Sequence, residues 1–213
     1  PGKIDATADL LHEVWTQTKD NVYLDAGGQE SPRLGGLQIV FCDYGTPSSE
    51  PDRFSVYDAL RDALVDRGLP RDRVRFIHEA KSDVEKARLF QECRDGEVSV
   101  IVGSTSKMGV GTNIQARAVH LVNMDVPWRP ADVQQRLGRA QRQGNQNAEI
   151  RVTNVITEKS FDTFMWQTVE RKGKFVDQIL GRGGGATSAE RTAEGDLGSL
   201  TISAGEAKAL ASG

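Results

Sequence analysis

The sequence has few cysteines and no long hydrophobic run. Only Cys42 and Cys93 occur in 213 residues, and they show neither CxxC nor zinc-site spacing. Cys42 falls in an apolar run and Cys93 in a helical pattern, so we expect reduced core thiols, as in a reducing compartment. No apolar run approaches the ~20 residues that a membrane helix needs. We therefore expect no membrane partner and a cytoplasmic protein.

Two common nucleotide-binding motifs are also absent. The chain has no G-x-x-x-x-G-K-[ST] string, and in the glycine-containing loop Lys107 precedes the glycines instead of following them. It has no D-E-x-[HD]-type acidic run for a metal, so we predict no metal ligands. It also has no G-x-G-x-x-G after the first predicted strand, which argues against a Rossmann-type enzyme for a small-molecule nucleotide. The chain by itself lacks the usual grip on a nucleotide's β- and γ-phosphates.

The overall balance of residues is that of a globular domain. Hydrophobic residues make up 38% of the chain and charged residues 27%, and 213 residues suffice for one domain with appendages. The formal net charge is −3. A contact with nucleic acid would therefore have to come from a local basic patch, since the overall charge does not favour it.

Strand and helix patterns alternate along the chain. Apolar or alternating runs predict strands at 37–42, 73–79, 98–104, 118–124 and 149–156. Helical periodicity, caps and stops predict helices at 3–20, from Ser49 and Pro51 to near Gly68, from the Ser82–Glu85 capping box to near Gly96, over the arginine-rich stretch 133–145, and at about 160–180. This order predicts an α/β fold with a mostly parallel sheet and helices on both faces.

The last part of the chain has a different composition. We expect one domain over 1–180, a flexible glycine-rich linker over 181–202 and the first turns of a further helix over 203–213. The chain begins at Pro1 without an initiator methionine, and we expect it to be a piece of a larger protein.

Two loops follow predicted strands at the edge where parallel sheets bind ligands. In "GSTSKMGVGTNIQ" (103–115), Gly109 and Gly111 allow a ligand to approach the backbone, and Thr112 and Asn113 offer polar groups to phosphate or sugar. A tight turn that needs glycine explains the same loop equally well. The second loop, 125–135, leads into the arginine-rich stretch. We expect the two loops to form one site.

The stretch "VQQRLGRAQRQGN" (133–145) places Arg136, Arg139 and Arg142 at three-residue intervals, roughly on one side of a helix. Like charges in a row repel one another, so an unpaired row needs solvent or an anion. Three alternatives stay open: a solvated helix, a nucleic-acid patch, or half of a phosphate site, which suits the planar fork of arginine. Gly138 beside Arg139 would allow a close approach to that helix.

Several stretches together resemble known motifs of superfamily-2 helicases. "QRLGRAQRQGN" resembles motif VI, Q-x-x-G-R-x-x-R, in the form found in Swi/Snf-type ATPases. "SKMGVGTNIQ" is similar to motif V, "NMDVPWRP" to the stretch between these motifs, and "LQIVFCDYGTP" to motif IV. The final "VTNVITEKSFDTFMWQTVERKGKFVDQIL" resembles the strand and bracing helix that follow motif VI. The resemblance covers residues 1–180 in the expected order.

The resemblance implies the second RecA-like domain of an ATP-dependent helicase or translocase. ATP and Mg²⁺ would be held mainly by a preceding N-terminal RecA-like domain of the same polypeptide, so this chain alone would bind no cofactor and would be inactive. Double-stranded DNA would be the other partner, held by its backbone. The finer resemblance is to large bacterial or phage proteins that join such a helicase to an adenine-specific methylase region, although no N/D-P-P-[YF] loop occurs here.

The resemblance also implies roles for individual residues. Arg139 and Arg142 match the motif VI arginines that reach the γ-phosphate, with Arg142 preferred as the arginine finger. The ATP cleft would be lined by Gln135, Gly109, Gly111 and Gly138, and nucleic acid would contact Thr112, Asn113 and Lys107. Arg136 occupies a variable position and would face solvent or another element. One alternative is a non-catalytic scaffold of the same fold that binds DNA or protein.

Overall fold

In the computed structural model of this protein, the described residues are 2–47, 54–108, 113–127, 129–157 and 160–179. Gly109, Gly111, Thr112 and the predicted segments 181–202 and 203–213 lie outside them. The chain divides into two compact units, Pro1–Asp125 with Asp132–Val155, and Val126–Ala131 with Ile156–Gly213.

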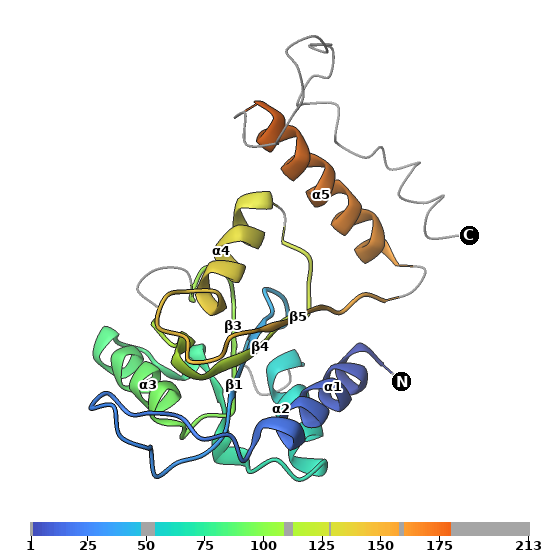
Figure 1. Cartoon of the computed structure of the whole chain (residues 1–213). Helices are drawn as coiled ribbons and strands as arrows, with labels where there is room; N and C mark the ends of the chain where they lie inside the picture. Colours follow the sequence, from blue (N-terminus) through green and yellow to red (C-terminus); the bar gives the residue numbers. More distant parts are fainter. Residues whose placement is uncertain (1, 48–53, 109–112, 128, 158–159, 180–213) are drawn as a thin grey trace. The chain divides into compact units, whose positions relative to one another are not determined.

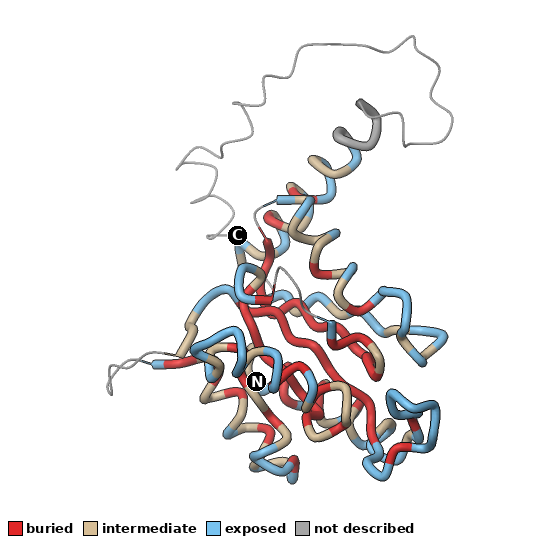
Figure 2. The backbone as a smooth tube through the Cα atoms, turned by 90° about the vertical axis from the view of Figure 1, so that its left-hand side faces the viewer, coloured by how far each residue is buried: buried red, intermediate tan, exposed pale blue. Residues whose placement is uncertain are grey.

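The first unit is built on a five-stranded sheet in which every pairing is parallel. The strand order is β2-β3-β1-β4-β5. The strands are β1 (Leu37–Phe41), β2 (Val74–Phe76), β3 (Val100–Gly103), β4 (Ala118–Asn123) and β5 (Arg151–Asn154). At the centre, Ile39 pairs with Ile101 on one side and Leu121 on the other. Figure 2 shows the buried residues along these central strands, which explains why their sequences are almost wholly apolar.

Helices cover both faces of this sheet (Figure 1). α1 (Lys3–Thr18) and α2 (Val56–Asp66) pack Leu11 and Leu60 into a core with alternate strand residues such as Val40. α3 (Asp83–Asp95) and α4 (Pro130–Ala140) place Phe90 and Ala140 in the core on the opposite face, with Ile39 and its neighbours. The predicted doubly covered parallel sheet is confirmed.

The start of α2 differs from the prediction. The helix begins at Val56, and Ser55 is its N-cap, whose hydroxyl accepts a hydrogen bond from the backbone N–H of Asp58. The predicted start at Ser49 and Pro51 is therefore wrong, and those two residues lie outside the described residues. The N–H of Val56 also donates to the carbonyl of Gly45, four residues beyond the end of β1, and this contact fixes the start of the helix next to Ser55.

Two other elements are shorter than predicted, and one agrees closely. β2 ends at Phe76 and continues as a 3₁₀ turn over Ile77–Glu79. α4 ends at Ala140, so Arg142 lies in the turn beyond the helix and does not share a helical face with Arg136. α3 has the predicted Ser82–Glu85 capping box and ends at Gly96 in the left-handed conformation.

A chain of polar groups crosses the sheet inside the core. The Gln38 amide donates to the carbonyl of Leu11 (2.8 Å), so its oxygen faces His120 Nδ1 (2.9 Å). That arrangement places the imidazole proton on Nδ1 and leaves Nε2 to accept from the Thr153 hydroxyl (2.9 Å). Burial, and secondarily the charge of Arg151, lowers the pKa of His120 to about 4. The folded state therefore holds a neutral histidine.

We expect this histidine to make stability depend on pH. Because the folded pKa lies below the ordinary value of 6.5, the unfolded chain binds the proton first and the free energy of unfolding falls as pH drops from about 6.5 towards 4. The loss attributable to His120 should be about 2 kcal/mol between pH 7 and pH 5. Urea denaturation of wild type and His120→Gln at both pH values measures it. Equal losses in the two proteins would contradict the assignment.

The second unit contains α5 (Phe161–Ile179), which agrees with the helix predicted at about 160–180. The Ser160 hydroxyl accepts from the backbone N–H of Asp162 (3.2 Å), and the Asp162 carboxylate accepts from the N–H of Thr157 (3.2 Å). The rings of Phe161 and Phe164 stack with their centroids 5.6 Å apart.

The two cysteines are free and buried, as predicted. Burial raises the pKa of the Cys42 thiol to about 12 and raises that of Cys93 as well, so both are unreactive thiols.

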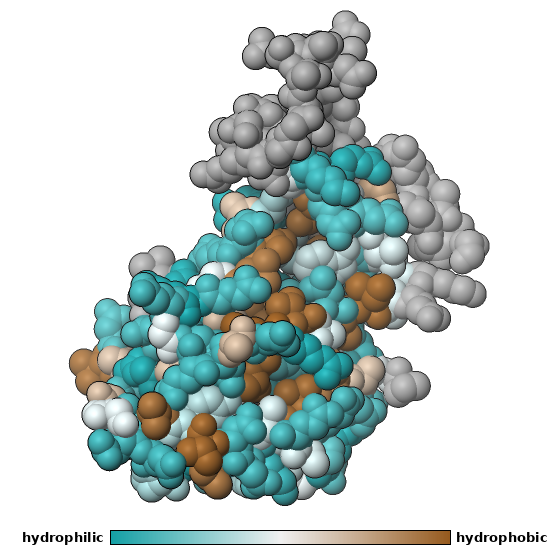
Figure 3. Space-filling model, viewed as in Figure 1, coloured by the Kyte–Doolittle hydropathy of each residue, from teal (hydrophilic) through white to brown (hydrophobic). Residues whose placement is uncertain are grey.

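The face in Figure 3 is dominated by hydrophilic residues. Among the described helices, none is long and apolar enough to span a bilayer.

Candidate functional site along helix α4

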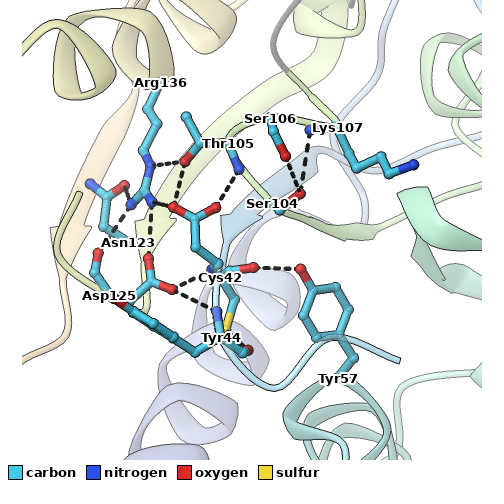
Figure 4. Close-up of polar contacts among 11 residues, drawn as sticks. Cys42, Tyr44, Tyr57, Ser104, Thr105, Ser106, Lys107, Asn123, Asp125 and Arg136 are labelled. Carbon is cyan, nitrogen blue, oxygen red and sulfur yellow. Dashed lines mark hydrogen bonds and ion pairs between the residues drawn. The ribbon is translucent and has the colours of Figure 1, made fainter. Parts of the chain in front are cut away.

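Arg136 is the arginine of this helix that is most buried and has the most hydrogen bonds. Its side chain is 1% exposed, and all five guanidinium N–H groups have an acceptor (Figure 4). Nε donates to Thr105 Oγ1 (2.9 Å), Nη1 to Asn123 Oδ1 and the Asp125 carbonyl (both 3.0 Å), and Nη2 to Asp43 Oδ2 (2.7 Å) and Asp125 Oδ1 (2.9 Å). Its guanidinium also lies 5.2 Å from the centroid of the Phe41 ring.

The residues that accept hydrogen bonds from Arg136 are also hydrogen-bonded to one another. Asp125 Oδ2 accepts from the backbone N–H groups of Asp43 and Tyr44, and the two Asp43 oxygens accept from the N–H (2.6 Å) and hydroxyl (2.9 Å) of Thr105. Burial raises the pKa of Asp125, and the positive charge of Arg136 opposes that rise. The network therefore joins α4 to the carboxyl ends of β1, β3 and β4, and it leaves no Arg136 donor for a ligand.

Of the two alternatives for Arg136, solvent or another element, the structure selects the second. Sequence reasoning missed its partners Asp43, Thr105, Asn123 and Asp125 as a group. One signal was available: a polar residue follows each of three predicted strands, and carboxyl ends of parallel strands meet at one edge. Thr105 of the first predicted loop and Asp125 of the second both bind Arg136 at this edge, and the expectation that the two loops form one ligand site stays a prediction.

Arg139 and Arg142 are placed differently. Arg139 is half-buried, and its Nε is enclosed without a hydrogen-bond partner among the described residues. Burial lowers the pKa of Arg139, and the charge of Arg142 lowers it further. Arg142 is exposed in the turn after α4 and lines an open hollow of about 600 Å³ formed by residues 141–145 and 147–150. Arg142 thus lies close enough for its positive charge to disfavour that of Arg139.

The loop 103–115 and the stretch 133–145 contact each other at two places. At one end Arg136 binds Thr105, and at the other the Gln115 amide donates to the carbonyl of Gln143 (3.0 Å). Since Asn145 donates to the carbonyl of Ala118, the turn that carries Arg142 lies by the first residue of β4. The turn with Arg142 and the Arg136 network therefore lie at opposite ends of β4, and the structure does not bring them together.

The other predicted site residues are only partly described. Gln135 is half-buried on α4, and a Cβ added at Gly138 would meet no atom within 4 Å among the described residues. Lys107 is exposed and points away from the Arg136 network in Figure 4, and its charge contributes to lowering the pKa of His78, after the larger effect of burial. Asn113 is exposed, and its carbonyl accepts from Arg94 (2.6 Å).

Metal-binding side chains do not cluster in the described part of the chain, since no three His, Cys, Asp or Glu residues converge there. The half-buried Arg139 and the exposed Arg142 instead suit an anion, because neither has an ion-pair partner among the described residues. A guanidinium group offers donors of the kind that bind phosphate in a fork geometry.

A sequence model of the helicase conserved C-terminal domain matches residues 33–144, just over half of the chain. The chain belongs to this family. A likeness to the solved C-terminal part of the Fun30 ATPase domain (TM-score 0.57, 20% identity, covering 79% of this chain and 45% of that one) supports the RecA-like fold of this helicase domain. The resemblance to superfamily-2, Swi/Snf-like helicases is thereby confirmed.

Curated relatives of the helicase domain are much longer than this chain. The chain is 29% identical over 93 residues to "Defense against restriction protein B" of Escherichia phage P1, which covers 44% of this chain and 4% of that protein. It is 28% identical over 147 residues to "Helicase-like transcription factor CHR28" of Arabidopsis thaliana, covering 68% of this chain and 15% of that protein. The chain thus spans a small fraction of the relatives it matches.

Proposed function

We propose that this helicase domain is the second motor domain of an ATP-dependent DNA helicase or translocase. A preceding N-terminal RecA-like domain of the same polypeptide would hold ATP and Mg²⁺. Family membership supports ATP-driven motor activity, and the names of the relatives include a helicase-like factor and an ATPase. The proposed helicase domain is 1–180, with α5 as its brace, a linker at 181–202 and a further helix from 203.

The contrast among three arginines carries the proposal. Arg136 has five satisfied donors, whereas Arg139 and Arg142 have no ion-pair partner among the described residues. An arginine that is half-buried beside a second cation is unfavourable by itself, and an anion between the two would relieve both the burial cost and the repulsion. A γ-phosphoryl group, whose negative charge spreads over three oxygens, fits that requirement.

The chemistry assigned to this chain is electrostatic. Arg142, with Arg139 beside it, would stabilise negative charge that develops on the transferring phosphoryl group, while Gln135, Gly109, Gly111 and Gly138 line the cleft. Mg²⁺ would neutralise phosphate charge when bound by the preceding domain. Because the arginines and the rest of the site lie on separate domains, closure on ATP and opening after hydrolysis would move the domains along DNA.

Contact with DNA is assigned to the motif V segment. Lys107 and Asn113 are exposed, and Thr112 belongs to the same loop, so these residues would bind the backbone of double-stranded DNA with little reading of bases. We also propose a bacterial or phage origin, a cytoplasmic location and a fused adenine-specific methylase region in the full-length protein. The phage P1 relative agrees with that origin.

The split site has a direct test. We expect the purified 213-residue chain to hydrolyse ATP no faster than a buffer control, because its own groups supply one wall of the site. The full-length protein, measured with and without double-stranded DNA, serves as the positive control. Turnover by the isolated chain well above the buffer control would overturn the split site.

A second candidate is a non-catalytic scaffold of the same fold. A scaffold would need no uncommitted arginines at the end of α4, so it would keep its function when Arg142 is replaced by alanine.

A further inference from the structure

The turn that follows α4 is held by its own amide side chains. In "RQGNQN" (142–147), Gly144 adopts a positive φ of 94° that lets the chain reverse. The Asn145 amide donates to the carbonyls of Ala140 (3.1 Å) and Ala118 (2.9 Å), which caps the last turn of α4 and ties it to the start of β4. The backbone N–H of Gln146 donates to the carbonyl of Ala116 (3.0 Å).

Two further amides of this turn reach a distant segment, residues 21–36, which we call the arm. The Gln146 side chain pairs with both polar groups of one peptide residue, accepting from the N–H of Leu24 (2.7 Å) and donating to its carbonyl (2.9 Å). The Tyr23 hydroxyl donates to the Asn147 amide oxygen (2.9 Å), and the Asn147 nitrogen donates to the carbonyl of Ala118 (3.1 Å). The amides thus span from the sheet to the arm.

The arm is itself fixed, so it can act as an anchor. Arg117 is 1% exposed and donates to the Arg33 carbonyl (2.7 Å), the Ser31 hydroxyl (2.6 Å) and the Arg94 carbonyl at the end of α3 (2.7 Å). Its guanidinium also lies 5.2 Å from the centroid of the buried Tyr23 ring. Because Arg117 ties the arm to α3, the Gln146–Leu24 contact fastens the turn to a rigid neighbour.

We propose that Gln146 is a positioning residue for ATP hydrolysis, because it holds the turn that carries Arg142. This inference rests on the proposed function of Arg142. Gln146 is exposed and contributes nothing to the hydrophobic core, so its two hydrogen bonds with Leu24 serve the conformation of the turn. A phosphate-binding arginine must be placed within a fraction of an ångström, and a displacement of about 1 Å can cost a large factor in rate.

The test is steady-state ATP hydrolysis by the full-length protein carrying Gln146→Ala or Gln146→Glu. The glutamate variant keeps the side-chain length but places a carboxylate oxygen, in place of the amide N–H donor, against the Leu24 carbonyl oxygen. We expect each variant to lower kcat about tenfold while the KM for ATP changes less than about twofold. Gln29→Ala is the matched control, since Gln29 is an exposed glutamine of the same arm whose side chain makes no hydrogen bond within the described residues.

A second background separates positioning from a general loss of structure. In the Arg142→Lys protein, whose finger is already impaired, Gln146→Ala should lower kcat by less than about twofold, because the two residues act through one group. Equal effects in both backgrounds, or no effect in either, would overturn the inference. If Gln146→Ala leaves kcat unchanged while Arg142→Ala abolishes turnover, only the positioning role of Gln146 is overturned. If Arg142→Ala leaves turnover intact, both proposals fall.

Discussion

The full-length protein with Arg142→Ala is expected to hydrolyse ATP about 10³-fold more slowly than wild type while binding ATP within a few-fold of normal. The reason is that the guanidinium stabilises the transition state more than it stabilises bound ATP. It acts on charge that grows in the transition state, whereas ATP binding in the ground state depends mainly on the preceding domain. Arg139→Ala should also lower kcat, by a smaller factor. Turnover and the Kd of a non-hydrolysable ATP analogue are the two measurements.

Arg88→Ala provides the control for this prediction. Arg88 is 83% exposed on α3 and forms an ion pair with Glu92, so the substitution removes an arginine without touching α4. Its kcat should match that of wild type. Retention of more than a tenth of wild-type turnover by Arg142→Ala would contradict the arginine-finger role. Retained DNA binding and biological function in that variant would favour the scaffold alternative.

Arg136→Ala is expected to destabilise the chain by about 3–5 kcal/mol. The substitution removes five hydrogen bonds and leaves the Asp125 carboxylate buried without its cationic partner, close to Asp43. Arg136→Lys should lose less but still be unstable, because an ammonium group has three donors and no planar fork. Urea denaturation of the 213-residue chain, monitored by far-UV circular dichroism, measures the free energy of unfolding.

Arg139→Ala is the matched control for that measurement, since it lies three residues along the same helix. Its guanidinium is half-buried without a hydrogen bond to Nε among the described residues, so its removal should change the free energy of unfolding by less than about 1 kcal/mol. Adding Asp125→Asn to Arg136→Ala should restore part of the stability by removing the orphaned charge. Equal destabilisation by the two arginine substitutions would show that the network is not the source of stability.

Elements specified by neighbouring residues were predictable from the sequence. The apolar runs of β1, β3 and β4 follow from burial on both faces, and the capping box of α3 is a contact between residues three apart. The start of α2 was not predictable in this way, because Ser49 and Ser55 are both competent caps. In the structure Ser55 is the cap and Val56 lies against Gly45, a contact that depends on how the chain after β1 packs on the start of α2.

The candidate site divides along the same line. The sequence by itself determined the order of the motifs, the alternation of strands and helices, and the presence of three arginines at equal spacing on and after α4. It contained no difference among those arginines that would reveal their partners. Only the tertiary structure decided that Arg136 is neutralised by Asp43 and Asp125, which lie 93 and 11 residues away along the chain. The physical reason is that the charge of a side chain is balanced by groups near it in space, and parallel strands bring together carboxylates from distant positions.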